Sequence, residues 1–246
     1  ALISSIEFNF GDINFRIADQ GIFNFPYIWH FNSYIAAILK LFLAIVIVSM
    51  TANEYSNKTL KQNLIDGLSK KEFILSKFLT VVLFSLVSTL FVFGVSLVLG
   101  LIFSDYNELG IIFSDIEYLF AYFIKLIGFF SFCLFLGILV KRSAFALGFL
   151  LIWSIAEGII YSIFKWKIFK DTEIAESMIQ FFPLTAMSNL IKEPFSRLGA
   201  VQTAANQLGE AFDKDYSVQF LTVIIVMAWT FLFIFGSYYI LKRRDL

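Results

Sequence analysis

The chain has 246 residues, of which 59 % are hydrophobic and 15 % charged, and its 19 basic residues balance its 19 acidic ones. Soluble domains have roughly 45–50 % apolar and about 25 % charged residues, so this composition excludes a water-soluble globule and a disordered chain. The absence of a basic excess argues against a nucleic-acid partner. The single cysteine, Cys133, lies within an apolar run and excludes a disulfide framework. The composition therefore indicates an integral membrane protein.

Five apolar runs are long enough to cross a bilayer as helices. They cover residues 31–52, 73–104, 116–140, 143–164 and 217–241. A helical span needs about 20 residues for a hydrocarbon core about 30 Å thick. None of the runs alternates as a transmembrane β-strand does. We therefore predict an all-α, polytopic fold, in which residues 1–246 form a single transmembrane domain.

Positively charged loops predict how these spans are oriented. Lysine and arginine concentrate in the loop 53–72, in the turn Lys141–Arg142 and at the C-terminus. Because cytoplasmic loops carry an excess of these residues, we expect all three to be cytoplasmic. Residues 1–30, 105–115 and 165–216 are then extracytoplasmic. If residues 1–30 are external, a membrane span must precede them. We therefore expect one upstream transmembrane helix and six spans in the intact protein.

The cytoplasmic loop contains a short amphipathic pattern. Leu60, Leu64, Ile65 and Leu68 fall on one face of a helix, and Gly67 is a suitable C-terminal stop. Ser69 and Glu72 have the spacing of a capping box that begins the second span. Such a helix either lies flat in the lipid headgroups or docks into a groove of a cytoplasmic partner. The composition of the helix leaves both interpretations open.

Three motifs in the expected order resemble the permeases of ABC-2-type transporters. The first consists of Glu54, Lys58-Thr59-Leu60, Asp66-Gly67, Ser69-Lys70 and Lys77. The second is the C-terminal end Lys242-Arg243-Arg244-Asp245-Leu246, and the third is Pro183-Leu184-Thr185 before the last span. The resemblance covers nearly the whole chain, and the family's first span and the cytoplasmic helix before it have no counterpart.

The resemblance implies a membrane-spanning permease subunit of an ATP-binding cassette transporter. Such a subunit moves a substrate across a bacterial-type cytoplasmic (inner) membrane, using ATP hydrolysis by a separate ATPase. The implied coupling helix includes Glu54, Lys58, Thr59, Leu60, Leu64, Ile65 and Leu68. The implied partners are that ATPase, a second permease subunit in a homodimer or heterodimer, and membrane lipids. The alternative is a non-transporting scaffold that passes ATPase-driven conformational change to an extracytoplasmic partner.

The resemblance implies that ATP hydrolysis takes place on the separate ATPase subunit. The chain contains no G-x-x-x-x-G-K-[ST] phosphate loop, so we expect ATP and Mg²⁺ on the ATPase and no cofactor or enzymatic activity here. No catalytic set and no metal-ligand spacing is apparent. The only histidine, His30, lies beside Trp29 at the outer boundary, where we expect an ordinary interfacial side chain.

Three ionisable residues lie inside the predicted spans, namely Lys40, Lys125 and Glu157. Each is roughly 12 Å from the outer end of its span, at 1.5 Å per residue. Charges within the membrane are costly and usually functional, so we predict that Glu157 pairs with Lys125 or Lys40. Alternatively, each lysine extends toward the outer headgroups. In the external segment, residues 171–182 and 198–212 show the periodicity of amphipathic helices.

Overall fold

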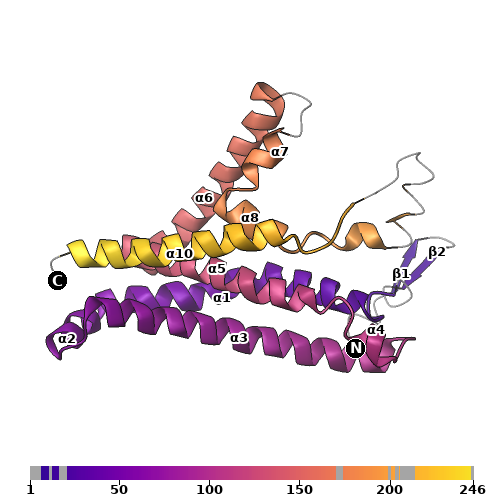
Figure 1. Ribbon diagram of the computed structural model, residues 1–246, viewed down its shortest axis with the longest axis horizontal. Helices are drawn as coiled ribbons and strands as arrows, with labels where there is room; N and C mark the ends of the chain where they lie inside the picture. Colours follow the sequence, from indigo (N-terminus) through magenta and orange to yellow (C-terminus); the bar gives the residue numbers. More distant parts are fainter. Residues whose placement is uncertain are drawn as a thin grey trace. The chain divides into compact units, whose positions relative to one another are not determined.

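The computed structural model describes residues 7–10, 13–16, 21–169, 174–198, 201–202, 205 and 214–244. Apart from one antiparallel hairpin, formed by β1 (Glu7–Phe10) and β2 (Ile13–Arg16), the described elements are helical (Figure 1). The helices are α1 (Tyr27–Ser56), α2 (Thr59–Ile65), α3 (Lys70–Phe103), α4 (Leu109–Ile112), α5 (Glu117–Val140), α6 (Ser143–Ile163), α7 (Ile174–Ile179), α8 (Pro183–Asn189) and α10 (Phe220–Arg243). A π-helical segment, η2 (Phe164–Ile168), extends α6, and a 3-10 turn, η3 (Phe195–Arg197), follows α8.

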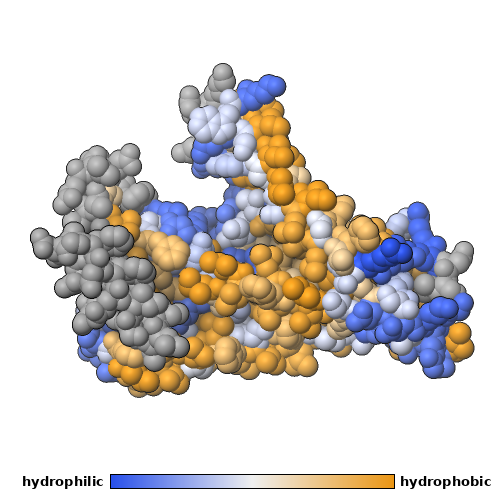
Figure 2. Space-filling view, turned by 180° about the vertical axis from the view of Figure 1, so that it is seen from behind, coloured by the Kyte–Doolittle hydropathy of each residue, from blue (hydrophilic) through white to orange (hydrophobic). Residues whose placement is uncertain are grey.

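Five helical segments are long and apolar enough to cross a membrane, which confirms the predicted spans. They are Tyr27–Ser56, Lys70–Phe103, Leu109–Val140, Ser143–Ile168 and Phe220–Arg243. Many large apolar side chains on them are exposed, and Figure 2 shows a hydrophobic surface over much of the molecule. Water would penalise such a surface, whereas lipid does not. The chain is therefore a helical, multi-pass membrane protein.

The chain divides into two compact units. Unit 1 comprises residues 1–36, 89–122 and 191–218, and unit 2 comprises residues 37–88, 123–190 and 219–246. Helices α1, α3 and α5 contribute residues to both units.

Unit 1 brings together the segments that flank the predicted outer ends of the spans. The indole nitrogen of Trp29 donates to the carbonyl of Ile112 at 2.6 Å, and the Asn24 amide donates to Asp105 at 3.3 Å. A side chain at Gly100 would meet the Phe25 ring at 2.2 Å, so only glycine permits this close approach. Residues 21–30 and 104–115 therefore lie at the same end of the spans, as their predicted external location requires.

Unit 2 brings together the three segments predicted to be cytoplasmic. The Lys70 ammonium donates to the carbonyl of Arg244 at 2.8 Å, and the Arg244 guanidinium donates to the carbonyl of Leu139 at 2.9 Å. The Lys141 ammonium lies 5.7 Å from the centre of the Tyr55 ring. The loop, the α5–α6 turn and the C-terminal end therefore share one side. That this side is the cytoplasmic one stays a prediction.

Helix α8, within the segment 165–216 that we predicted to be extracytoplasmic, packs against the spans of unit 2. It packs against α10 and α6 (Figure 1). A side chain at Gly128 of α5 would lie 2.8 Å from Val226 of α10 and 3.2 Å from Met187 of α8. Val226 is about 9 Å inside the end of α10, at 1.5 Å per residue. Residues 183–189 therefore return to the depth of the spans.

Pro183 explains why a new helix begins at this point. Proline is favoured in the first turn of a helix, and Pro183 occupies that position in α8. Of the helix predicted over residues 171–182, α7 covers Ile174–Ile179, and residues 171–173 lie outside the described part of the chain. The other predicted helix, over residues 198–212, falls mostly outside the described residues.

Candidate functional site

The loop between the first two spans is held by the carboxylate of Glu54, near the end of α1. The hydroxyl of Thr59, the first residue of α2, donates to Glu54 Oε2 at 2.6 Å. The ammonium of Lys77 in α3 forms an ion pair with Glu54 Oε1. Only 17 % of the Glu54 side chain and 15 % of the Lys77 side chain are exposed. One carboxylate therefore joins three consecutive helices, and its partners are residues of the first resemblance motif.

Helix α2 presents a different surface from the one predicted. The side chain of Leu60 is 1 % exposed and Leu64 is half-buried, whereas Ile65 is 75 % and Leu68 36 % exposed. Leu60 is therefore not available to a partner or to the headgroups, unlike the other residues of the predicted apolar face, because it anchors α2 to its own chain. The apolar side chains left for a partner are Ile65, the last residue of α2, and Leu68, in the loop that follows, and we call these two residues the α2 surface. Lys58 and Lys61 are also exposed.

The capping box at the start of α3 is confirmed. The backbone N–H of Ser69 donates to Glu72 Oε2 at 2.9 Å, and the backbone N–H of Glu72 donates to Ser69 Oγ at 3.2 Å. This exchange satisfies N–H groups that have no partner within the helix. Together with the bond from Lys70 to the C-terminal end, it fixes the point at which the loop enters α3.

Glu157 of α6 lies at the N-terminal end of α8. Its side chain is buried, and its two oxygens accept four hydrogen bonds. The backbone N–H groups of Leu184 and Thr185 donate at 3.1 and 2.9 Å, and the Thr185 hydroxyl donates at 2.9 Å. The indole of Trp153 donates at 2.7 Å. The carboxylate is thus stabilised by the positive end of a helix dipole.

The two lysines have separate environments. The Lys125 ammonium is buried and donates to the carbonyl of Ser188, in the last turn of α8, at 3.3 Å. The Lys40 ammonium lies 4.7 Å from the centre of the Phe129 ring, a cation–π contact. Within the described part of the chain, neither forms an ion pair with Glu157. The predicted pairing is therefore wrong.

The physical reason for this difference is α8 itself. A helix has partial positive charge at its first N–H groups and partial negative charge at its last carbonyls. Glu157 and Lys125 bind these opposite ends, so each charge is stabilised by the dipole and is not paired with the other residue. The sequence contained both charges and the Pro-Leu-Thr motif, but nothing in it indicated that they meet.

A cavity of about 500 Å³ lies between α6, α7 and α8. Its polar lining residues are Ser154, Glu157, Tyr161, Glu176, Thr185, Ser188 and Asn189, and Gly158, Ile179 and Leu184 complete it. Near one edge, Lys165 pairs with Glu176 at 3.2 Å and donates to the Tyr161 hydroxyl at 3.1 Å. The cavity is therefore a polar space adjoining an otherwise apolar span.

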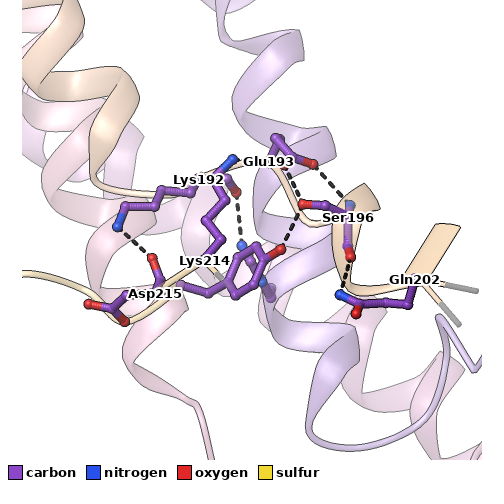
Figure 3. A network of polar contacts seen from close by, with 8 residues as sticks. Lys192, Glu193, Ser196, Gln202, Lys214 and Asp215 are labelled. Atoms are coloured by element: carbon purple, nitrogen blue, oxygen red, sulfur yellow. Dashed lines mark hydrogen bonds and ion pairs between the residues drawn. The ribbon is translucent and has the colours of Figure 1, made fainter. Parts of the chain in front are cut away.

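A polar network occupies unit 1 after α8 (Figure 3). The Glu193 carboxylate accepts a hydrogen bond from the Lys214 ammonium at 2.8 Å, and it also accepts the hydroxyl and the backbone N–H of Ser196. Burial would by itself raise the pKa of the Glu193 carboxyl. The bonds from Lys214 and Ser196 outweigh burial and hold this pKa below its usual value.

His30 belongs to the same unit and is fully buried, although an interfacial side chain was expected. Its Nε2 lies 2.9 Å from the carbonyl of Lys192, its Nδ1 lies 3.1 Å from the Arg197 guanidinium, and its ring stacks on Tyr118. Because the carbonyl is an acceptor, Nε2 carries the proton and Nδ1 accepts from Arg197. Its partners are far away in sequence, so no local pattern could have identified this role.

Comparison with known proteins gives one match. A family model described as "Protein of unknown function (DUF2705)" matches residues 2–246. No curated protein matches the chain, and no solved structure matches it. Among the described residues, no group of three or more histidine, cysteine, aspartate or glutamate side chains could hold a metal ion.

Proposed function

The chain belongs to this family, whose description gives no function, and we propose that it is the membrane-spanning subunit of an ATP-driven transporter. A separate cytoplasmic ATPase supplies the energy and binds ATP and Mg²⁺. A second permease subunit completes the assembly in a bacterial-type inner membrane. The multi-pass helical fold and the absence of a phosphate loop from the sequence support this division of labour.

The α2 surface is the observation that carries the proposal. Glu54 connects α2 to the helices on both sides, and buried Leu60 anchors it. Because α2 is held in place, a movement that a bound partner imposes on it is passed on to α1 and α3 together. It also loses little conformational entropy on binding, which favours docking. The exposed Ile65 and Leu68 then supply the apolar contact.

The proposal is tested by isolating the chain from its native membrane together with its ATPase. Replacing Ile65 by Asp should weaken ATPase binding at least about tenfold, since an interface anchor is worth about 2 kcal/mol or more. Lys61→Ala is the matched control, because an exposed charge mostly affects the association rate. The measurements are copurification and the ATP hydrolysis stimulated by the permease.

The two variants separate the possible outcomes. Loss of binding with Ile65→Asp and retention with Lys61→Ala supports the docking role. If Ile65→Asp retained full binding and stimulation, α2 would be an interfacial helix and the proposal would lose its main support. Neither substitution alters a membrane span, so both variants should insert normally.

A further inference from the structure

The cavity between α6, α7 and α8 has the size of a small-molecule site. Its volume of about 500 Å³ lies within the range of about 300–1,000 Å³ that is usual for ligand pockets. All of its lining residues belong to unit 2, and α8 is held beside it by Glu157 and Lys125. Its walls are therefore positioned before any ligand enters.

The charge on its wall favours a cation. Glu157 lines the cavity and is 5 % exposed, and all four of its hydrogen-bond donors are electrically neutral. No lysine or arginine in the described ranges lies within ion-pair distance of it, whereas Glu176, the other lining carboxylate, is balanced by Lys165. A carboxylate without a counter-cation in surroundings of low dielectric constant attracts positive charge.

Further hydrogen-bonding groups line the same cavity as Glu157. The side chains of Ser154, Ser188 and Asn189 line the cavity and make no hydrogen bond within the described part of the chain. A protonated primary amine has three donors and no acceptor. Two hydroxyl oxygens and one amide oxygen, beside a carboxylate, can accept all three. The lining therefore matches an ammonium group better than an anion.

The cavity adjoins an apolar groove on the lipid-facing side of α6. The groove is lined by four large apolar side chains, Ile155, Ile159, Ile163 and Trp166, and by Gly158, Ser162 and Lys167, and Figure 2 shows a hydrophobic strip along the helix. Gly158 lines both the groove and the cavity, and no atom lies within 4 Å of where its Cβ would be. A chain can therefore pass from one space to the other across Gly158.

We propose that this site binds a membrane amphiphile, with its primary ammonium head in the cavity and its hydrocarbon tail in the groove. If the chain is a transporter, as proposed above, an amphiphile with a primary ammonium head is also the class of substrate that it moves. Charge complementarity selects the head, and the apolar side chains of α6 select the tail. The polar wall of α7 and α8 separates the head from surrounding lipid.

The test measures binding to the full chain alone, purified in dodecyl maltoside without an ATPase. The probe is dodecylamine with a bromine at the end of its tail, which quenches tryptophan fluorescence on contact. Trp166 lies in the groove and reports the tail. We expect saturable quenching, and binding about tenfold tighter than for the bromine-tipped alcohol or carboxylate of equal length, because only the amine complements Glu157.

Two variants and a control make the result decisive. Gly158→Leu should weaken amine binding at least about tenfold by filling the junction. Gly148→Leu, on the same helix with equally open surroundings and outside both spaces, should leave it unchanged. Glu157→Gln should remove the preference for the amine over the alcohol.

Equal binding of the three probes, or unchanged amine binding by Gly158→Leu, would overturn the assignment. Because no ATPase is present, such a result would leave the copurification test of the α2 surface unaffected. The two proposals can therefore fail independently.

Discussion

The ion pair between Glu54 and Lys77 should contribute measurably to the stability of the loop. At an effective dielectric constant of about 20, opposite charges about 4 Å apart attract by about 4 kcal/mol, which is an upper limit. Fully exposed pairs are worth only about 0.2–1 kcal/mol. Since the side chains are 17 % and 15 % exposed, we expect an intermediate coupling of about 2 kcal/mol.

A double-mutant cycle measures this coupling directly. Glu54→Gln, Lys77→Met and the double variant are compared with the unchanged chain by the free energy of unfolding in detergent. Each single variant leaves a nearly buried charge without its partner, so the double variant should destabilise by less than the sum of the two single variants. Glu54→Gln keeps an acceptor for the Thr59 hydroxyl, so the cycle isolates the ionic contact.

The same chain contains a matched control pair. Lys165 and Glu176 are 45 % and 61 % exposed, so their coupling should be much weaker than that of Glu54 and Lys77. Equal coupling in the two pairs, or coupling near zero for Glu54 and Lys77, would refute the conclusion that this ion pair fastens α1 to α3 on the two sides of α2. The α2 surface would then lack the rigid base on which transmission depends.

Three further predictions concern packing, pH and topology. Gly128→Leu should destabilise unit 2 by about 1–3 kcal/mol through overpacking against α8 and α10, whereas Gly148→Leu should not, as thermal unfolding of both variants will show. The depressed pKa of Glu193 contributes stability that is complete above its unfolded value near 4.5 and is lost as pH falls through the lower folded pKa. Glu193→Gln should abolish this loss of stability at low pH, which is measured as the free energy of unfolding against pH. An unchanged pH profile of that free energy would contradict the assignment. In intact cells, an impermeant thiol reagent should label a cysteine at Asp105 but not one at Lys58, and the reverse pattern would invert the topology.

Periodicity and composition were sufficient to determine the membrane spans. Hydrocarbon thickness imposes a minimum apolar length on any helix that crosses it, so the five runs could be recognised without knowledge of their neighbours. The capping box of Ser69 and Glu72 was equally predictable, because both partners lie within one helical turn. These features depend on residues close together in the chain.

Tertiary structure alone decided which partners the charged residues of the candidate site bind and which of its apolar side chains are buried. Leu60 and Ile65 have the same hydrophobic character, yet packing buries one and exposes the other. Glu157 and Lys125 bind the two ends of α8 instead of each other. The short helix packs against the spans, so its first N–H groups reach Glu157 and its last carbonyls reach Lys125. Each outcome depends on contacts between distant segments, and neither hydrophobic periodicity nor residue charge specifies which segments meet.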